Sequence, residues 1–493
     1  MNKRLIVYFH YDPRGQVDSA CRFAVQALAR CGDLFFVTNG TLEEASRRWV
    51  GSVCFDCLER PNTGFDVGAY RDALCRLGRP TLDRYSEIVL MNYTLAGPVL
   101  PVERMFETMD RRTELDFWGL TRHYAMKSRR FGGQVPEHLQ SHFLAVRPRM
   151  MEDFWNYWQT IRLPSRYEES VICHETRFTP YFAARGYRWD SYVDTGDLAP
   201  VFVNPIMACP AELIRSRGCP FFKRRSFFTP YGDELRRTDG QAAAELYRYL
   251  REQTAFPVQE LVASLLPVQP LTNMAQNLHW QFLLPEKADG KLPRQLGPDD
   301  LRSPVKLDPD GIYFLPLPQN SGDAIGWYLD RSIPDETVQR AAAALLRREP
   351  WIGVLGPALP LFPACLAEKQ SRWHRDLPYL RQRMEELHLK VPLEERQALP
   401  LPNGGGLFLR AEAFPQGLPA ITQRGDLWLL PLIAQYNGHG SAVYETASQS
   451  LARGAVLEQC LYNQMGLRAN AKNLARSAKA AWRERKGENG NAG

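Results

Sequence analysis

The sequence lacks any long apolar run. No window approaches the roughly 18 consecutive apolar residues that a membrane-spanning helix needs, so no transmembrane helix is expected. The first segment, residues 1–15, also lacks the apolar stretch of a secretory signal peptide. Both absences predict a cytoplasmic chain that is soluble or peripheral to a membrane.

The sequence also lacks a large excess of either sign of charge. The chain has 61 basic and 55 acidic residues, a formal net charge of +6. This excess is too small and too mixed to indicate nucleic acid as the main partner. It suits a phosphorylated ligand and an anionic membrane surface equally well.

Closely spaced cysteines are nearly absent. Ten cysteines are scattered singly, except for Cys54 and Cys57. Such a pair could hold zinc or act in redox chemistry, but no second close pair accompanies it. Buried free thiols in a reducing compartment are the simpler interpretation.

What the sequence does contain is an alternation of apolar runs with helical patterns. This alternation predicts an α/β fold, with a parallel sheet covered by helices and ligands bound at the carboxyl ends of the strands. A later segment, residues 168–187, has the pattern of one helix ending near Gly186. The predicted strands are residues 5–11, 33–40, 53–59, 87–93 and 141–148.

The composition changes after about residue 250. A polar, proline-bearing stretch, residues 287–309, is typical of a linker. Apolar runs then return at 311–318, 351–363 and 402–414, with a helical pattern at 335–348, and predict a second α/β unit without clear repetition of the first.

Three domains are therefore predicted: residues 1–250, residues 251–465, and a basic tail over 466–493. The second would bind the acceptor or form another transferase-like site. The tail is either a solvated helix that frays or a contact with an anionic membrane surface.

The most informative short segment is "RPNTGFDVGAYRDAL", residues 60–74, at a predicted strand-to-helix junction. Gly64 and Gly68 allow close backbone approach, and the following helix offers unpaired N–H groups to an anion. Asp66 could accept a hydrogen bond from a ribose or a base, or cap the helix. By spacing alone, a purely structural turn is an equally good interpretation.

Four segments in series carry a resemblance to a known family. They are "RPNTGFDVGAYRDAL", "EIVLMNYTLAGPVLP", "SHFLAVRPRMMEDFWNYW" and "VICHETRFTPYFAARGY". In order and spacing they resemble the rhamnan synthesis F family of glycosyltransferases. The resemblance implies a GT-A type domain that binds a nucleotide sugar.

The resemblance also implies an activity and partners. The expected reaction transfers a deoxyhexose, typically rhamnose from dTDP-rhamnose, to a polysaccharide or lipid-linked glycan of the cell envelope, such as lipopolysaccharide O-antigen. The expected location is the inner face of the membrane, and no nucleic acid partner is expected.

Candidate site residues follow from the motifs and the resemblance. Glu175 falls where the family segment has its acidic residue, and is the predicted base for the acceptor hydroxyl. The predicted donor-binding residues are His10, Asp12, Asn62, Gly64, Asp66, Gly68, Arg71 and Asn92.

The sequence departs from metal-dependent GT-A enzymes at the fourth strand. Those enzymes place Asp-x-Asp there to hold a divalent cation against the diphosphate. This chain has Asn92, Tyr93 and Thr94. No cofactor is therefore assigned, Mg²⁺ or Mn²⁺ is left open, and Arg60 or Arg71 could take over the charge.

Two other classes of function are the alternatives to a transferase. The absent Asp-x-Asp favours a non-catalytic polysaccharide-assembly protein that retains the transferase fold. A nucleotide-sugar epimerase or reductase is disfavoured, because no G-x-G-x-x-G follows the first strand.

Overall fold

The computed structural model describes residues 3–129, 133–285, 288–297, 299–318 and 322–464. The chain forms two compact units, Met1–Leu265 with Gln276–His279 and Leu266–Ala275 with Trp280–Gly493. The basic tail predicted over residues 466–493 lies outside the described residues.

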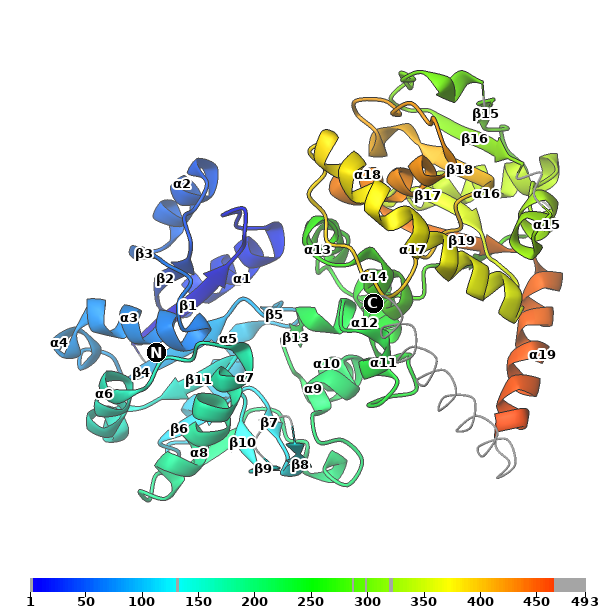
Figure 1. The fold of residues 1–493 in the computed structure, drawn as a ribbon. Coiled ribbons are helices and arrows are strands. Elements are labelled where there is room, and N and C mark those ends of the chain that lie inside the picture. The colour runs from blue at the N-terminus through cyan, green and yellow to red at the C-terminus, as the bar shows by residue number, and fades with distance from the viewer. Residues whose placement is uncertain (1–2, 130–132, 286–287, 298, 319–321, 465–493) are drawn as a thin grey trace, which may run out of the picture. The chain divides into compact units, whose positions relative to one another are not determined.

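The first unit is built on a seven-stranded sheet in the order β12-β6-β11-β4-β1-β2-β3 (Figure 1). Neighbouring strands are parallel except at β11, which is antiparallel to both β4 and β6. The strands are β1 (Arg4–Tyr11), β2 (Asp33–Asn39), β3 (Asp56–Arg60), β4 (Glu87–Asn92), β6 (Phe117–Gly119), β11 (Phe143–Val146) and β12 (Trp189–Ser191).

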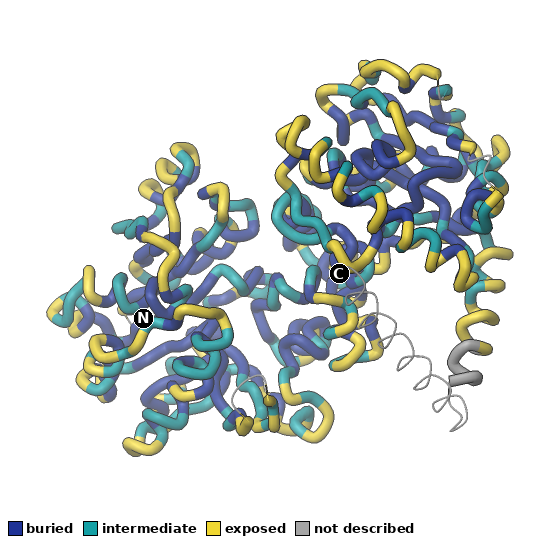
Figure 2. The backbone as a smooth tube through the Cα atoms, viewed as in Figure 1, coloured by how far each residue is buried: buried dark blue, intermediate teal, exposed yellow. Residues whose placement is uncertain are grey.

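Helices cover both faces of this sheet, so its central strands are apolar throughout. Side chains alternate along β1: Ile6 and Tyr8 pack on one face, and Leu5 and Val7 pack on the other. The first face is covered by α1 (Ser19–Ala29) and α5 (Val102–Asp110), and the second by α3 (Phe65–Leu77), α6 (Met151–Thr160) and α8 (Thr176–Ala183). Figure 2 shows the resulting buried interior along the strands.

Short elements extend the first unit beyond the predicted sheet. Three two-stranded ladders pair β5 (Leu95–Ala96) with β13 (Phe222–Lys223), β7 (Arg122–His123) with β10 (His138–Leu139), and β8 (Met126–Ser128) with β9 (Gly133–Val135). β5 and β7 follow soon after the carboxyl ends of β4 and β6, so these ladders build up the edge where ligands bind in such sheets. The helices are α2 (Glu44–Val53), α4 (Arg79–Leu82), α9 (Pro205–Ala208), α10 (Pro210–Arg217), α11 (Tyr231–Glu234), α12 (Ala242–Gln253) and α13 (Val258–Leu265).

The helix predicted over residues 168–187 is not regular. It consists of α7 (Tyr167–Ser170), a π-helical turn η3 (Val171–Glu175) and α8. A π turn inserts extra backbone into a helix, and such turns occur frequently at functional sites. Here the wide turn ends on Glu175, and so decides which way this carboxylate points.

The second unit has a six-stranded mixed sheet in the order β14-β19-β17-β18-β16-β15. Its strands are β14 (Gln281–Leu283), β15 (Arg294–Gln295), β16 (Ile312–Leu317), β17 (Ile352–Pro357), β18 (Gly405–Arg410) and β19 (Gly440–Glu445). Its helices include α15 (Ala324–Arg331), α16 (Glu336–Arg348), α17 (Pro363–Glu386), α18 (Leu429–Tyr436) and α19 (Ala447–Gln464).

The predicted elements of this unit are confirmed at β16, β17, β18 and α16. The linker predicted over residues 287–309 is wrong in part, because β15 lies in it and pairs with β16. Two residues are too short for sequence periodicity to reveal a strand. Among the described helices, none combines the length and the apolar character that crossing a membrane requires.

Candidate active site

The turn between β3 and α3 is organised by a buried arginine. Arg60, the last residue of β3, donates from Nη2 to the Thr63 carbonyl oxygen at 2.8 Å and from Nε to Asp72 at 2.7 Å. Its Nη1 donates to the Asn39 side chain at the end of β2. Arg60 is 7% exposed. Its guanidinium therefore holds the loop together, and it is not free to bind a phosphate as the sequence suggested.

The two glycines of this turn are required for different physical reasons. Gly64 adopts φ +74 and is the N-cap of α3, a backbone conformation that glycine takes without strain. Gly68 lies inside α3, where a Cβ would sit 2.2 Å from the Thr63 carbonyl oxygen. The absent side chain at position 68 thus makes room for the protein's own backbone.

Asp66 and Asn92 meet at the carboxyl edge of the sheet. Asn92 ends β4 and donates from Nδ2 to Asp66 Oδ2 at 3.3 Å, and the Val67 N–H donates to Asp66 Oδ1 at 3.0 Å. Burial and then the charge of Glu175 raise the pKa of Asp66 to about 6. Asp66 and Glu175 are therefore two carboxylates close enough for each to affect ionisation of the other.

Glu175 is held in its ionised form. Its Oε2 accepts hydrogen bonds from the Ser141 hydroxyl at 2.6 Å and the Ser141 N–H at 3.2 Å, and its Oε1 lies 3.7 Å from His138 Nε2. Burial acts to raise the pKa of Glu175, but His138, Lys223 and Ser141 together hold it well below its usual range. The side chain is 20% exposed, so its oxygens are not sealed from solvent.

A lysine completes the charged cluster. Lys223 lies on β13, and burial lowers its pKa to about 8 although the charges of Glu175 and Asp66 oppose that shift. The next residue, Arg224, forms a buried ion pair with Asp18, the N-cap of α1. This pair anchors β13 and so fixes where the lysine emerges.

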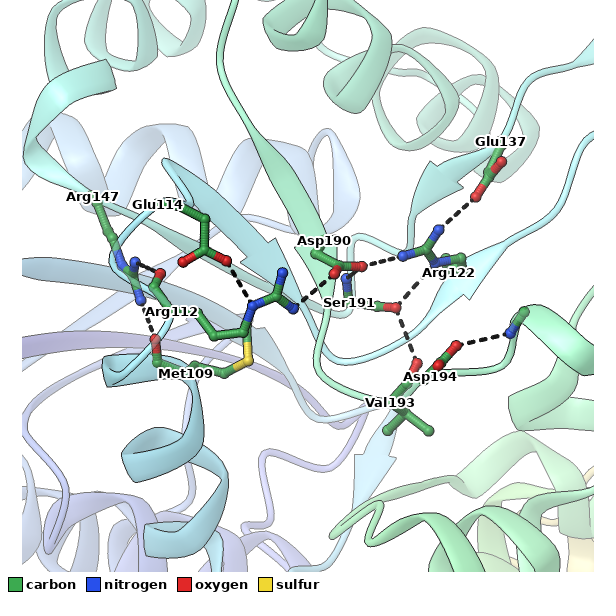
Figure 3. A network of polar contacts seen from close by, with 11 residues as sticks. Met109, Arg112, Glu114, Arg122, Glu137, Arg147, Asp190, Ser191, Val193 and Asp194 are labelled. Carbon is green, nitrogen blue, oxygen red and sulfur yellow. Dashed lines mark hydrogen bonds and ion pairs between the residues drawn. The ribbon is translucent and has the colours of Figure 1, made fainter.

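The ladder that carries His138 is fastened to the sheet by ion pairs (Figure 3). Arg122, on β7, donates to Glu137 at 2.9 Å and to the Ser191 hydroxyl at 3.1 Å, and it also pairs with Asp190 on β12. β7 pairs with β10, which begins at His138. The network thereby sets the position of the imidazole beside Glu175.

Two more histidines border the cluster. The His123 ring stacks on that of His138, with centroids 5.1 Å apart. His142 is 1% exposed, its Nδ1 has no hydrogen-bond partner among the described residues, and burial together with Lys223 lowers its pKa well below the usual value. His142 is therefore a neutral polar group at the edge of the cluster.

The structure brings some of the predicted residues together and separates others. Glu175, Asp66 and Asn92 form one cluster. His10, whose pKa burial lowers to about 4, contacts Thr38 Oγ1 at 3.1 Å and the Gln16 carbonyl oxygen at 3.2 Å. It is therefore a neutral, buried histidine.

The remaining predicted residues have local partners. Asp12 caps its own turn, accepting from the N–H groups of residues 14 and 16 at 2.8 and 3.1 Å. Asn62 accepts from the Asn39 side chain at 2.9 Å, and Arg71 donates to Asp72 at 3.1 Å. Their donor-binding roles stay predictions.

Sequence reasoning missed Lys223, Ser141 and His138. Lys223 lies in "FFKRRSFF", where nothing distinguishes it from the neighbouring arginines. Ser141 begins the predicted strand at 141–148 and His138 lies just before it, and the order of residues at the start of a strand does not reveal which helix they will face. No group of three or more His, Cys, Asp or Glu side chains within the described ranges is arranged to hold a metal ion.

Comparison with known proteins decides the family. The model of the family described as rhamnan synthesis protein F matches residues 34–307, more than half of the 493-residue chain. The chain belongs to the rhamnan synthesis protein F family. This confirms the resemblance that the four sequence segments indicated.

One curated relative is the uncharacterised protein y4gN of Sinorhizobium fredii (strain NBRC 101917 / NGR234). It is 26% identical over 200 residues, which are 39% of this chain and 49% of that protein. The chain thus spans about half the length of this relative.

Solved structures that match part of the chain include two mannosyltransferases. One, from Pyrobaculum calidifontis in complex with GDP-Man and Mn²⁺, is 9% identical with a TM-score of 0.26, and the match covers 38% of this chain and 54% of that one. The other, Ktr4p from S. cerevisiae in complex with GDP, is 9% identical with a TM-score of 0.22, covering 36% and 64%. The predicted α/β class, with a second α/β unit after the first, is confirmed by the two sheets and their helices.

Substituting Gly68 tests the packing of the turn. We expect Gly68→Ala to lower the free energy of unfolding by about 1–3 kcal/mol, because the added methyl group overlaps the Thr63 carbonyl. The matched control is Gly51→Ala in α2, where nothing lies within 4 Å of a Cβ and alanine favours the helix. Chemical denaturation compares the two variants, and equal stabilities would contradict the packing role.

Substituting Asp66 tests the coupling of the carboxylates. The pKa of Asp66 is about 6 in the fold against an ordinary 3.8, so the folded chain binds a proton that the unfolded chain has lost between these values. This contribution to stability falls as the pH rises through the window. We expect Asp66→Asn to stabilise the protein at pH 7–8 by up to about 2–3 kcal/mol, and hardly at all near pH 4.

Thermal unfolding against pH measures this effect. In a Glu175→Gln background the gain from Asp66→Asn should shrink, because the charge of Glu175 is the second cause of the raised pKa. A gain that is the same at every pH, or undiminished in that background, would show that the two carboxylates are not coupled.

Proposed function

We propose that this protein is a glycosyltransferase that transfers rhamnose from dTDP-rhamnose to a polysaccharide or lipid-linked glycan of the cell envelope. Membership of the rhamnan synthesis protein F family supports this proposal. So does the GT-A-like sheet, whose charged cluster lies where ligands bind in open α/β sheets.

One observation carries the proposal: two carboxylates and a half-buried lysine come together at the sheet edge. Their environments separate the pKa values, with Asp66 raised to about 6 and Glu175 held well below its usual range. Paired titratable groups driven apart in this way are typical of active sites.

Lys223 would stabilise the leaving group. When the bond between the sugar and the diphosphate breaks, negative charge grows on the diphosphate oxygens. A positively charged ammonium group in a low-dielectric site offsets that charge better than it would in water. The N–H groups in the first turn of α3 would add to the effect.

Glu175 would accept the proton of the acceptor. As the acceptor oxygen bonds to the anomeric carbon, its hydroxyl proton passes to the carboxylate, and the diphosphate departs with the electrons of the broken bond. Ser141 and His138 contact the carboxylate and would hold it in one orientation. Both are thus positioning residues.

We also propose a division of labour between the two units. The first, which the sequence bounded at residue 250, would carry out transfer. The second, predicted over 251–465, would bind the acceptor, and the basic tail over 466–493 would contact an anionic membrane surface at the cytoplasmic face.

Glu175→Gln tests the base. We expect the variant to keep its donor affinity and fold but to lower sugar transfer by at least about 100-fold, since glutamine cannot take a proton. A glutamine still offers an oxygen to Ser141. Calorimetry with dTDP and a transfer assay with dTDP-rhamnose give the two measurements.

The control is Glu169→Gln. Glu169 lies in α7 and accepts from the Ser165 hydroxyl and N–H at 2.9 and 2.8 Å, away from the charged cluster. Its substitution should leave transfer unchanged. Full activity of Glu175→Gln would move the base to another residue, and an inactive wild type on every donor would favour a non-catalytic assembly protein.

Lys223→Met tests the cation. Methionine has a similar length without charge, so we expect dTDP affinity to fall at least about tenfold and to lose part of its salt dependence. Lys127→Met, on the exposed strand β8, is the matched control and should bind as the wild type does.

The same dTDP titrations test whether donor binding requires a metal ion. If Lys223 supplies the charge, dTDP affinity should survive EDTA. A collapse of affinity with EDTA that Mn²⁺ restores would assign the charge to a cation instead and leave Lys223 a secondary role.

A further inference from the structure

The second sheet repeats part of the first. Five strands of the first unit occur along the chain in the order β1, β4, β6, β11 and β12, with other strands between them. In the sheet they lie in the spatial order β12-β6-β11-β4-β1. In the second unit, β15, β16, β17, β18 and β19 follow one another and lie in the order β19-β17-β18-β16-β15. In both sheets only the fourth of these strands, β11 or β18, is antiparallel to its neighbours.

An arginine after the antiparallel strand has a specific task in the first unit. Arg147 follows β11 and begins a 3-10 turn. It donates to the carbonyl oxygens of Met109, Arg112 and Leu115 at 2.6, 2.6 and 3.0 Å. These carbonyls lie at and just after the end of α5, the helix that leads into β6. The arginine thereby caps that helix.

The second unit has the same arrangement. Arg410 ends β18, begins a 3-10 turn, and donates to the carbonyl oxygens of Leu346, Glu349 and Ile352. These carbonyls lie at and just after the end of α16, the helix that leads into β17. Arg410 thus occupies the place of Arg147 in strand order, in sequence position and in what it binds.

The turn into the last strand is also repeated. Gly186 follows α8 and Gly438 follows α18, with φ +81 and +78. In each turn the glycine N–H donates to the carbonyl three residues earlier, and the next N–H donates to the carbonyl five residues earlier, at 3.0 and 3.3 Å or 3.0 and 2.8 Å. The turn at Gly186 and the turn at Gly438 therefore have the same two hydrogen bonds.

The residues of the active site are not repeated. Eleven residues before Gly186 is Glu175, and eleven before Gly438 is Leu427. With Arg147 and Arg410 taken as equivalent, the β16 residue at the register position of Asn92 is Leu317. Within the described part of the second unit, the sheet ends at β15, with no counterpart of β2, β3 and α3.

The second unit nevertheless has a cavity at the equivalent edge. About 200 Å³ in volume, it lies at the carboxyl ends of β17 and β19. Glu445, which ends β19 and is 6% exposed, lines it, and its Oε2 forms an ion pair with Arg453 but accepts no hydrogen bond among the described residues. Arg453 Nε lies 3.3 Å from that oxygen, and Arg453 Nη1 donates to the Leu359 carbonyl at 2.7 Å.

The size and lining of the cavity restrict its ligand. Pockets for drug-sized ligands span about 300–1,000 Å³, so this cavity is too small for a nucleotide sugar. The Glu445 carboxylate can accept hydrogen bonds from hydroxyl groups, and Arg453 can donate to ring or hydroxyl oxygens. The rest of the wall includes Tyr328, Leu361 and Val456, an apolar surface that suits the C–H face of a sugar.

We infer that the second unit is a shortened copy of the first sheet that has no transfer site, and that its cavity binds one sugar residue of a neutral glycan. This inference rests on the proposed function for its biological setting, because the glycan would then be the acceptor. The binding itself does not require that the first unit be active.

Two substitutions in the full chain test the cavity. Glu445→Gln removes the carboxylate with little change of shape, and Ala452→Trp fills the cavity from α19, which Ala452 helps to line. We expect each to weaken the affinity for a rhamnose trisaccharide at least about tenfold by calorimetry, with dTDP affinity unchanged. Leu451→Trp is the control, since Leu451 is 77% exposed on the same helix and does not line this cavity.

The outcomes separate this inference from the proposed function. A wild type that binds no trisaccharide, or binds it equally well in both cavity variants, overturns the sugar site while the dTDP results stand. If Glu175→Gln keeps about half of the transfer rate, the second unit has a transfer site of its own and is not a binding copy. Failure of dTDP to bind, with trisaccharide binding lost in the cavity variants, overturns the proposed transferase and supports the sugar site.

Discussion

The candidate active site depends on the attraction between the positive charge of Lys223 and the carboxylates of Asp66 and Glu175. Asp66 and Glu175 come close enough to affect one another's ionisation, and two carboxylates in a partly buried site do not stay together without a positive charge nearby. Lys223 is half-buried and feels the charges of both carboxylates, and desolvation nevertheless lowers its own pKa to about 8. In this site the attraction between opposite charges therefore offsets the cost of removing each charge from water.

The charged side chains must be held in fixed positions, and segments outside the main strands of the sheet hold them. The π turn aims Glu175, the Arg122 network fixes the ladder of His138, and the Arg224–Asp18 pair anchors β13. The Arg122 network lies just after β6, whereas the π turn lies between the helices α6 and α8. The sheet provides the frame, and the irregular segments built on it provide the chemistry.

The two units meet the same packing problem in the same way. An antiparallel strand inside an otherwise parallel sheet must be followed by a return to the helical layer, and the end of the preceding helix leaves carbonyl groups without partners. Arg147 and Arg410 each satisfy those carbonyls with one planar, multiply donating side chain. The polar residues of the candidate active site, by contrast, differ between the units, although the strand order is the same.

The sequence alone determined the alternation of elements, the α/β class, most strands of the first sheet, three of the six strands of the second and the family, because periodicity and turn residues are local properties. It also identified Asp66, Asn92 and Glu175, which lie in recognisable segments. Only the tertiary structure decided that Lys223, Ser141 and His138 join them, that Arg60 and Gly68 serve the turn, and that the second sheet repeats the first. Contacts between distant segments depend on strand order and register, and local sequence does not encode which segment will become the neighbour of another.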